Sequence, residues 1–297
     1  MARKEILDRI EKYIDPFRIT KGKSFRLDDF DPGDTCGLRL DKAEAAATRH
    51  RVARRGAGHA LRPESLVAVA CVPGDGCGRQ GRDHQARHVR CKSSGLSSFL
   101  VQAALVGGSR SRFSLALREA LARAGKHRIF NRSYYEEVLV VRVHEHIWNR
   151  QKLPPSLLSK RIWDERLFDI AHFEDYLTRQ GTIILKFFLH VSRKEQKKRF
   201  MERLDRPDKH WKFSPSDVHE RRFWGDYKHA FEEAIRATAS KRAPWYVVPA
   251  DNKWFTRLLV AAAIVEAVEK LDLAYPTVDS KKKKELQTMR AALSREK

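Results

Sequence analysis

Basic side chains recur at short spacing between residues 199 and 212, and their types suit the binding of phosphate oxygens. Arginine presents a planar fork of N–H donors that matches phosphate geometry, whereas lysine supplies a compact positive charge. The candidates for binding a substrate or polyanion are Arg199, Arg203, Arg206, Lys209 and Lys212. Arg199 and Arg203 lie four residues apart, so on a helix they share one face and could reach one anionic chain together. The alternative is a solvated basic face, which is what most such runs are.

The charge of the whole chain points to the same kind of partner. Its 297 residues hold 60 Lys and Arg against 38 Asp and Glu, a net charge of +22. Such an excess indicates a polyanion, which could be nucleic acid, an acidic membrane surface or polyphosphate. The chain has no apolar run of about 18 residues, which argues against a membrane span. Residues 1–18 are charged and lack a secretory core, so we expect a cytoplasmic protein.

Alternating strands and helices must position these side chains. Residues 181–191 (GTIILKFFLHV) form a nearly continuous apolar run rich in β-branched residues, which is typical of a parallel strand covered on both faces. Residues 245–248 predict a second buried strand, and residues 137–143 fit either a strand or a buried helix. We predict helices at residues 159–179, 194–204, 254–271 and 281–296. This alternation favours an α/β fold with a parallel sheet.

Composition changes abruptly near Ala45 and changes back near Gly125. The 80 residues between them hold 14 Lys and Arg, of which 13 are Arg, and only four acidic residues. They contain nine of the 15 glycines and no Ile, Met, Asn, Tyr or Trp. Such a composition is poor material for strands or for a packed core. Outside this segment 46 basic and 34 acidic residues remain, a net charge of +12.

Three interpretations of this segment compete. It could be a basic arm that binds nucleic acid, a divergent insertion, or coding sequence translated out of frame. The out-of-frame interpretation can be tested by back-translation. Pro73–His84 permits codons that yield QGMDAAGKDGT when they are read one base later. That string contains GxxxxGK, a phosphate-binding loop of Walker A type. Shifted readings of the flanking residues extend it to a strand, loop and helix, so we favour a frame slip near Ala45 that is reversed near Ala124.

Four groups of residues outside this segment resemble one family. They are FNRSYYEEVL at residues 130–139, KFFLHVSRKEQKKRFMERL at 186–204, DKHWKFS at 208–214 and PADNK at 249–253. Together they are similar to family-2 polyphosphate kinases over residues 126–276. The resemblance implies a P-loop-kinase-like (thymidylate-kinase-like) parallel sheet flanked by helices, with a basic helical lid and a channel for polyphosphate. It also implies Mg²⁺-dependent transfer of phosphoryl groups between inorganic polyphosphate and nucleotides, either ADP/ATP or GDP/GTP.

The same resemblance assigns roles to single residues. Arg132, which follows Asn131 at the end of a core strand, would touch the phosphate being transferred and is the catalytic candidate. Glu136 and Glu137 could support a metal ion indirectly. They could equally be an acidic pair that is favourable at a helix N-terminus. The five cations of residues 199–212 would be lid residues that bind polyphosphate.

The resemblance fails at the phosphate loop. The family's loop is expected at about Gly74, Gly78 and Arg79, but Gly78-Arg79 stands where the family has Gly-Lys. We therefore expect the first strand, the phosphate loop and the following helix to be disrupted, with the alternative that the strand, which reads VAVACV, still pairs. Without the loop and its lysine, transfer should fall to background, because these groups supply most of the electrostatic stabilisation.

These observations divide the chain into four parts. They are an N-terminal helical segment (1–44), the aberrant segment that stands in for the phosphate-loop region (45–124), the kinase core and lid (125–276), and a charged C-terminal helix (277–297). The function predicted is phosphoryl transfer between polyphosphate and nucleoside mono- or diphosphates. A catalytically dead, frameshifted product and a basic nucleic-acid-binding protein are the alternatives. By resemblance we expect a homo-oligomer, either a dimer or a tetramer.

Overall fold

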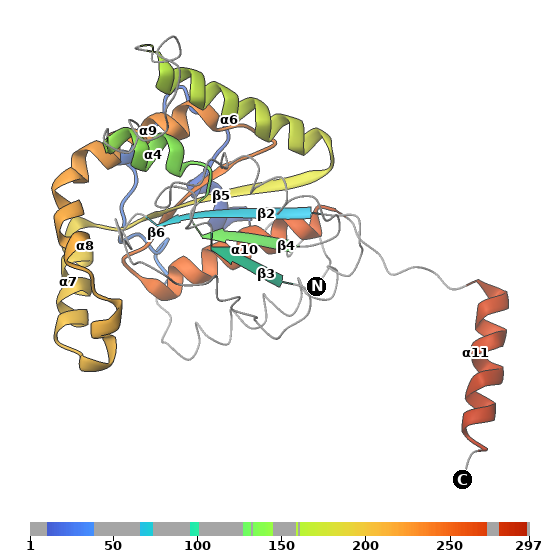
Figure 1. Cartoon of the computed structure of the whole chain (residues 1–297). Coiled ribbons are helices and arrows are strands. Elements are labelled where there is room, and N and C mark those ends of the chain that lie inside the picture. Colours follow the sequence, from blue (N-terminus) through green and yellow to red (C-terminus); the bar gives the residue numbers. More distant parts are fainter. Residues whose placement is uncertain are drawn as a thin grey trace, which may run out of the picture.

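The computed structural model describes residues 11–38, 66–73, 96–100, 127–131, 133–144, 159, 161–271 and 279–295. For the strands at 66–73, 96–100 and 127–131, and for Lys212, the description is of the backbone. These residues form one six-stranded sheet with helices on both faces (Figure 1). None of the helices described is long and apolar enough to cross a bilayer.

The sheet combines parallel strands with one antiparallel edge strand. Its strands are β1 (Arg18–Ile19), β2 (Leu66–Pro73), β3 (Leu96–Leu100), β4 (His127–Asn131), β5 (Thr182–His190) and β6 (Trp245–Pro249). Their order is β1-β6-β5-β2-β4-β3, and β1 alone among them runs against its neighbour. The carboxyl ends of the other strands therefore meet at one edge of the sheet, where ligands bind in open α/β folds.

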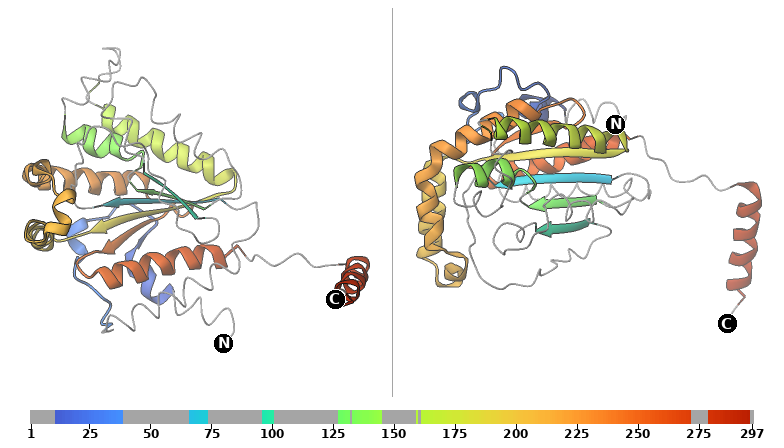
Figure 2. Two further views of the ribbon diagram at one scale, coloured as in Figure 1. Left: turned by 60° about the horizontal axis from the view of Figure 1, so that its bottom comes forward. Right: turned by 45° about the horizontal axis from the view of Figure 1, so that its top comes forward.

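Helices cover both faces of this sheet. They are α4 (Glu136–Val143), α6 (Ile162–Arg179), α7 (Arg193–Leu204), α8 (Pro215–Glu220), α9 (Trp224–Thr238), α10 (Lys253–Glu269) and α11 (Ser280–Leu293), with short 3-10 helices η1 (Asp15–Phe17), η2 (Leu27–Asp29), η4 (Pro207–Lys212) and η5 (Arg221–Phe223). Figures 1 and 2 show α4, α6 and α9 on one face and α10 on the other. α7 and α8 project from the end of the sheet where β5 finishes, and α11 stands apart (Figure 2).

The alternation of side chains on the central strands builds two cores. On β6, Trp245 and Val247 face the layer of α4, α6 and α9, whereas Tyr246 and Val248 face α10. Phe188 on β5 joins the first core. Strands β5 and β6 are thus covered on both faces, as the sequence predicts. The helices predicted at 159–179, 194–204, 254–271 and 281–296 are confirmed to within a few residues at each end.

Residues 137–143, which fit either a strand or a helix, belong to the helix α4 (Glu136–Val143). Glu136 and Glu137 lie in its first turn, where acidic side chains stabilise the helix dipole. Val138, Leu139 and Val141 are buried, so the helix packs one apolar face against its layer. A strand would have divided these apolar side chains between two opposite faces.

The expectation that the first strand is disrupted is wrong. β2 is formed from Leu66 to Pro73 and pairs in parallel register with β5 on one side and β4 on the other. Its sequence, LVAVACVP, is apolar and contains β-branched residues, and pairing through the backbone does not depend on the side chains that a family prefers. The predicted phosphate loop, at about Gly74, Gly78 and Arg79, and the helix expected after it lie outside the described residues.

A buried ion pair crosses the first core. Lys186 on β5 is fully buried, and its Nζ lies 2.6 Å from Glu174 Oε2 on α6 and 2.8 Å from the Thr238 carbonyl oxygen at the end of α9. Burial lowers the pKa of Lys186, and the adjacent carboxylate opposes this by stabilising the ammonium ion. The pair fastens α6 and α9 to the central strand.

Two tyrosines extend this network to the start of α4. The hydroxyls of Tyr134 and Tyr135 lie 2.5 and 2.8 Å from Glu174 Oε1. Burial, together with Glu174, raises the pKa of Tyr135 well above its usual value, so its hydroxyl stays protonated at neutral pH. Thr238 Oγ1 lies 2.8 Å from the Tyr135 hydroxyl and accepts from the Trp245 indole at 2.9 Å. Five elements therefore share one set of polar contacts.

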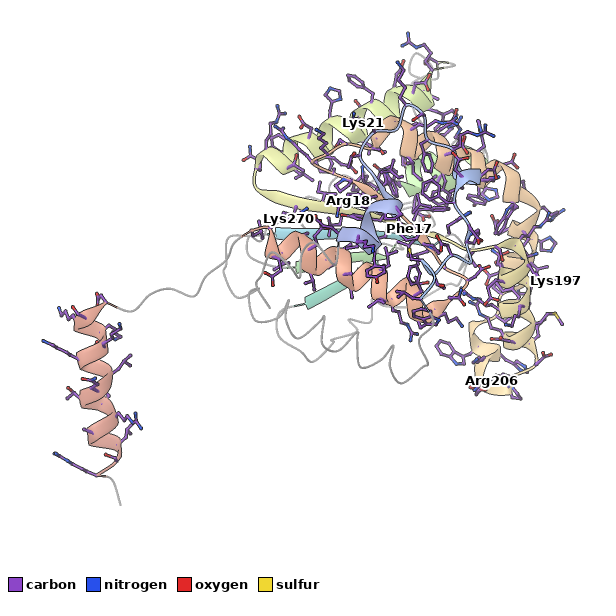
Figure 3. The ribbon with its side chains drawn as sticks, turned by 180° about the vertical axis from the view of Figure 1, so that it is seen from behind. Phe17, Arg18, Lys21, Lys197, Arg206 and Lys270 are labelled. Atoms are coloured by element: carbon purple, nitrogen blue, oxygen red, sulfur yellow. The ribbon has the colours of Figure 1, made fainter. Side chains whose placement is uncertain are left out.

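A second ion-pair cluster lies on the α10 face. Glu266 on α10 is 2% exposed and is neutralised by Arg18 of β1 and by Lys270, whose Nζ is 2.5 Å from Glu266 Oε1. Phe17, beside Arg18, packs edge-on against Phe255 of α10 at 5.9 Å between ring centroids. Figure 3 shows Phe17, Arg18 and Lys270 on this side of the molecule. The edge strand β1 is thus held by both charge and packing.

We expect Lys186→Met to lower the free energy of unfolding by about 3–5 kcal/mol, because Glu174 would keep a buried charge without its cation. The double variant Lys186→Met/Glu174→Gln should lose clearly less than the sum of the two single variants. Lys197→Met, at an exposed position of α7, is the matched control and should stay within about 0.5 kcal/mol of the original protein. Urea unfolding followed by tryptophan fluorescence measures the original protein and all four variants, and additive losses would contradict a coupled pair.

Candidate active site at the carboxyl edge of the sheet

The carboxyl ends of four parallel strands bring the candidate residues to one edge. β2 ends at Pro73, β4 at Asn131, β5 at His190 and β6 at Pro249. Asn131 pairs with Cys71, and Cys71 with Phe187, so β4, β2 and β5 run level there. The catalytic candidate Arg132 follows β4 at this edge in sequence but lies outside the described residues.

The chain directly after Arg132 is anchored in the core. Ser133 is 1% exposed, and its Oγ accepts from the Tyr135 backbone N–H at 3.3 Å. Tyr134 and Tyr135 then bind Glu174, as described above. A rigid attachment of this kind is what a phosphate-positioning residue requires.

Glu136 and Glu137, the acidic pair considered for a metal ion, are engaged with the protein. Glu137 Oε1 lies 2.6 Å from Arg166 Nη1, and Glu136 is buried at the start of α4. Arg166 also lies over the Trp163 ring, at 5.2 Å. Among the described residues no group of three or more His, Cys, Asp or Glu side chains could hold a metal ion. We therefore assign none of the described carboxylates as a metal ligand.

The loop after β6 joins two other segments at this edge. Asp251 Oδ1 accepts from the Ser192 N–H at 2.8 Å, and the Asp251 N–H donates to the Pro32 carbonyl at 3.1 Å. Asn252 Nδ2 donates to the Gly33 carbonyl at 3.0 Å. The Asp-Pro-Gly sequence at residues 31–33 is therefore part of the edge. Residues 249–253 carry the family resemblance, but nothing in their sequence indicates these partners.

His190 completes this junction. Its Nε2 lies 3.1 Å from the Phe30 carbonyl oxygen, and its own carbonyl accepts from the Ala250 N–H at 2.8 Å. Burial lowers the pKa of His190, so the neutral imidazole donates from Nε2 to Phe30. The ends of β5 and β6 and the N-terminal loop thus form one connected rim.

The lid begins at this rim and is docked to it through Arg199. Ser192 caps α7, with its Oγ accepting from the Glu195 N–H at 3.0 Å. Arg199 Nε donates to Glu195 Oε1 at 2.9 Å, and its Nη2 donates to the carbonyls of Ala250 and Asp251 at 2.5 and 3.2 Å. Arg199 therefore faces the end of β6, where it ties α7 to the sheet.

Arg203, one turn later, faces the inside of the lid. It lies over the Phe200 ring at 5.3 Å and 4.0 Å from Asp217 Oδ2, a fully buried carboxylate of α8. Arg221 also lies over Phe200, at 6.0 Å, and donates to the Arg193 carbonyl at 3.3 Å. Arg199 and Arg203 do share one face of α7, as predicted, but that face turns toward the end of β6 and toward Asp217 of α8.

The remaining three of the five cations, Arg206, Lys209 and Lys212, follow the C-terminal end of α7. Arg206 donates to Asp208 through Nε at 3.1 Å and through Nη2 at 2.9 Å, with over half of each side chain exposed. Figure 3 shows Arg206 at the far tip of the lid and Lys197 on its outer side. Lys209 and Lys212 belong to η4, which follows directly, and Trp211 between them is 70% exposed.

A further contact links the lid to α4. His144, at the C-terminal end of α4, lies 2.9 Å from Glu220 Oε2 of α8, and Tyr227 of α9 donates to the same oxygen at 3.0 Å. The His144 ring packs edge-on against Phe223 at 4.9 Å. Because α4 follows Arg132, this contact connects the α8 end of the lid to the segment that carries the catalytic candidate. Sequence spacing alone gives no sign of it.

Comparison with known proteins agrees with this geometry. The family model described as Polyphosphate kinase 2 (PPK2) matches residues 111–275. An ADP-polyphosphate phosphotransferase of Rhodopseudomonas palustris is 45% identical over 174 residues, which are 58% of this chain and 60% of that protein. An AMP/ADP-polyphosphate phosphotransferase of Meiothermus ruber is 34% identical over 277 residues, 90% of this chain and 97% of that one.

A solved structure extends the likeness to the fold. The crystal structure of Polyphosphate Kinase 2 from Arthrobacter aurescens TC1 has a TM-score of 0.72 and 31% identity, and the match covers 91% of this chain and 95% of that chain. The P-loop-kinase-like fold class predicted from the sequence is therefore confirmed.

We expect Arg199→Lys to loosen the lid, because a single ammonium cannot reach Glu195 and both carbonyls at the end of β6. The loss of charged hydrogen bonds should lower the free energy of unfolding by about 1.5–3 kcal/mol. Hydrogen–deuterium exchange should rise in α7 and leave α10 unchanged. Lys197→Arg, at an exposed position of the same helix, is the control, and an equal rise in both variants would contradict a docking role for Arg199.

Proposed function

Because the chain belongs to the polyphosphate kinase 2 family, we propose that it transfers phosphoryl groups between inorganic polyphosphate and nucleoside mono- or diphosphates. The observation that carries the proposal is the placement of a basic lid directly at the carboxyl edge of four parallel strands. Phosphoryl transfer asks a protein mainly to position its substrates and to neutralise charge. A rigid edge and a positively charged lid supply these two requirements.

The proposal divides the cations by their surroundings. Arg132 contacts the phosphate that is transferred, and the anchored residues after it fix its position. Arg206, Lys209 and Lys212 bind the polyphosphate chain, because they lie in the outer part of the lid. Arg199 and Arg203 act by holding the lid in place, through the strand end and Asp217. We keep Mg²⁺ as the proposed cofactor and assign it no ligand.

The proposal extends to substrate, location and assembly. The nucleotide is ADP/ATP or GDP/GTP, and the enzyme works in the cytoplasm, where such nucleotides are held. The chain forms a homo-oligomer, a dimer or a tetramer. Its division into an N-terminal segment (1–44), an aberrant segment (45–124), a core with lid (125–276) and a terminal helix (277–297) is part of the same proposal.

Whether this chain can transfer phosphoryl groups depends on residues 45–124. We propose that they are translated out of frame and that the phosphate loop returns when the frame is restored. The family model leaves residues 45–110 unmatched, although its match includes residues 111–124. On this proposal the phosphoryl transfer proposed above belongs to the protein with these residues in frame. The alternative is that the frame slips are genuine and that this chain is a catalytically dead product of a polyphosphate kinase gene. A basic nucleic-acid-binding protein, which the net charge of +22 would also suit, is the competing class.

We expect the purified chain to form ATP from polyphosphate, ADP and Mg²⁺ only at background rate in a luciferase-coupled assay, because it lacks the loop lysine. The chain with residues 45–124 restored to the other frame should form ATP readily. Rapid ATP formation by the printed chain would overturn the frame proposal. Background rates for both chains with ADP, AMP and GDP would overturn the phosphotransferase proposal, and tight binding of duplex DNA by both would then favour the nucleic-acid alternative.

Binding of polyphosphate tests the lid without requiring catalysis. We expect the triple variant Arg206→Gln/Lys209→Gln/Lys212→Gln to bind fluorescent polyphosphate about tenfold more weakly, since each exposed contact contributes roughly 0.5 kcal/mol. Its affinity should also depend less steeply on salt, because fewer cations contact the chain. Lys281→Gln/Lys282→Gln/Lys283→Gln on α11 removes the same charge elsewhere. Equal losses in the two triple variants would mean that overall charge, and not the lid, binds the polyanion.

A further inference from the structure

α6 exposes a line of side chains on the side that faces away from the sheet. With 3.6 residues per turn, these positions fall within one narrow strip of the helix surface. The strip consists of Arg161, Glu165, Phe168, His172, Tyr176 and Arg179, all of which are exposed, and we call it the α6 stripe. Figure 1 shows α6 as the outermost element on its face of the molecule.

The stripe carries two large exposed aromatic side chains. Phe168 is 62% exposed and Tyr176 is 54% exposed. His172 lies between them, with its ring centroid 3.8 Å from that of Phe168 and its Nδ1 2.9 Å from the Phe168 carbonyl oxygen. The opposite face of α6 already packs on the core through Leu167 and Glu174. A contiguous aromatic surface that folding does not use is typical of an interaction site.

The charges of the α6 stripe are complementary to those of a second copy of the stripe that runs antiparallel to it. Glu165 lies one turn before Phe168, and Arg179 lies one turn after Tyr176. If a second α6 packs antiparallel with a two-fold axis at His172, Phe168 of each copy meets Tyr176 of the other. Glu165 of each copy then meets Arg179 of the other. An isologous interface requires this kind of self-complementarity, and a partner of another kind would not require it.

We propose that the α6 stripe is the contact surface between two copies of this chain, packed as antiparallel helices about His172. This inference rests on the self-association proposed above and not on phosphoryl transfer. The partner we infer is a second copy of this chain, because the charged residue at each end of the stripe meets a residue of opposite charge on the stripe of the other copy.

Contacts within one chain do not pair Glu165 with Arg179. The two residues are 14 positions apart, which is about 21 Å along a helix. Within the chain Glu165 accepts from Ser159 Oγ at 3.4 Å, and Arg179 lies 3.5 Å from Asp175, both at exposed positions. Any coupling measured between Glu165 and Arg179 therefore reports contact between molecules.

Sedimentation equilibrium of the full chain over a range of concentrations tests the proposal. We expect a dimer for the original protein and a dissociation constant raised at least about tenfold by Glu165→Arg, because like charges then meet at two symmetric places. The double variant Glu165→Arg/Arg179→Glu should recover most of the lost affinity. Glu285→Arg makes the same charge change on α11 and should leave the dissociation constant unchanged.

Three results would overturn the proposal: a monomer at every concentration, a Glu165→Arg variant that dimerises normally, or a double variant without recovery. Because mass and not turnover is measured, these results are independent of whether the chain transfers phosphate.

A cysteine at the axis gives a second measurement. Helices packed about 8–10 Å apart bring axial Cα atoms within disulfide reach, so His172→Cys should form a disulfide-linked dimer on oxidation. Asp164→Cys, off the stripe on the same helix, and the original protein are the controls. Equal cross-linking in all three proteins would contradict the proposed axis.

Discussion

Lys186 lies wholly inside the protein with its ammonium group 2.6 Å from a buried carboxylate, and most of the first core is arranged around that pair. A charge in this position is tolerated only when every hydrogen-bonding group around it is matched, which fixes how α6 and α9 approach β5. Because Glu174 also binds Tyr134 and Tyr135, the same constraint sets the start of α4. The core therefore fixes the position of the chain next to Arg132. The rim and the lid follow directly from the ends of the core strands.

Much of this architecture can be predicted from the sequence where periodicity is strong. Strands β5 and β6 are long apolar runs, and a run of that kind has few alternatives to a covered parallel strand. Helices α6, α7 and α10 have clear spacing, so their limits are predicted to within a few residues. Periodicity fails at residues 137–143, because a short apolar run fits the two-residue period of a strand as well as the 3.6-residue period of a helix. Only packing against α9 makes this run a helix.

The candidate site is less accessible to the same reasoning, because its contacts join segments that are distant in sequence. Spacing places Arg199 and Arg203 on one face of α7, but it does not say what that face meets. Folding turns it toward the end of β6 and the buried Asp217. The contact of His144 with Glu220 depends on how α8 returns over α4, and no local pattern records that. Composition also misled us about β2, since a strand held on both sides needs little from its own side chains.

β1 is only two residues long, yet it closes the edge of the sheet beside β6. Arg18 reaches Glu266, 248 positions later in the chain. During synthesis Arg18 leaves the ribosome 248 residues before Glu266 does. At about 5–20 residues per second it waits on the order of ten seconds or more for a sheet to join. A ribosome that stopped early, as after a frame slip that is never reversed, would release this amino-terminal segment without the strand edge that it pairs with. Chaperones would bind such a product, or proteases would degrade it.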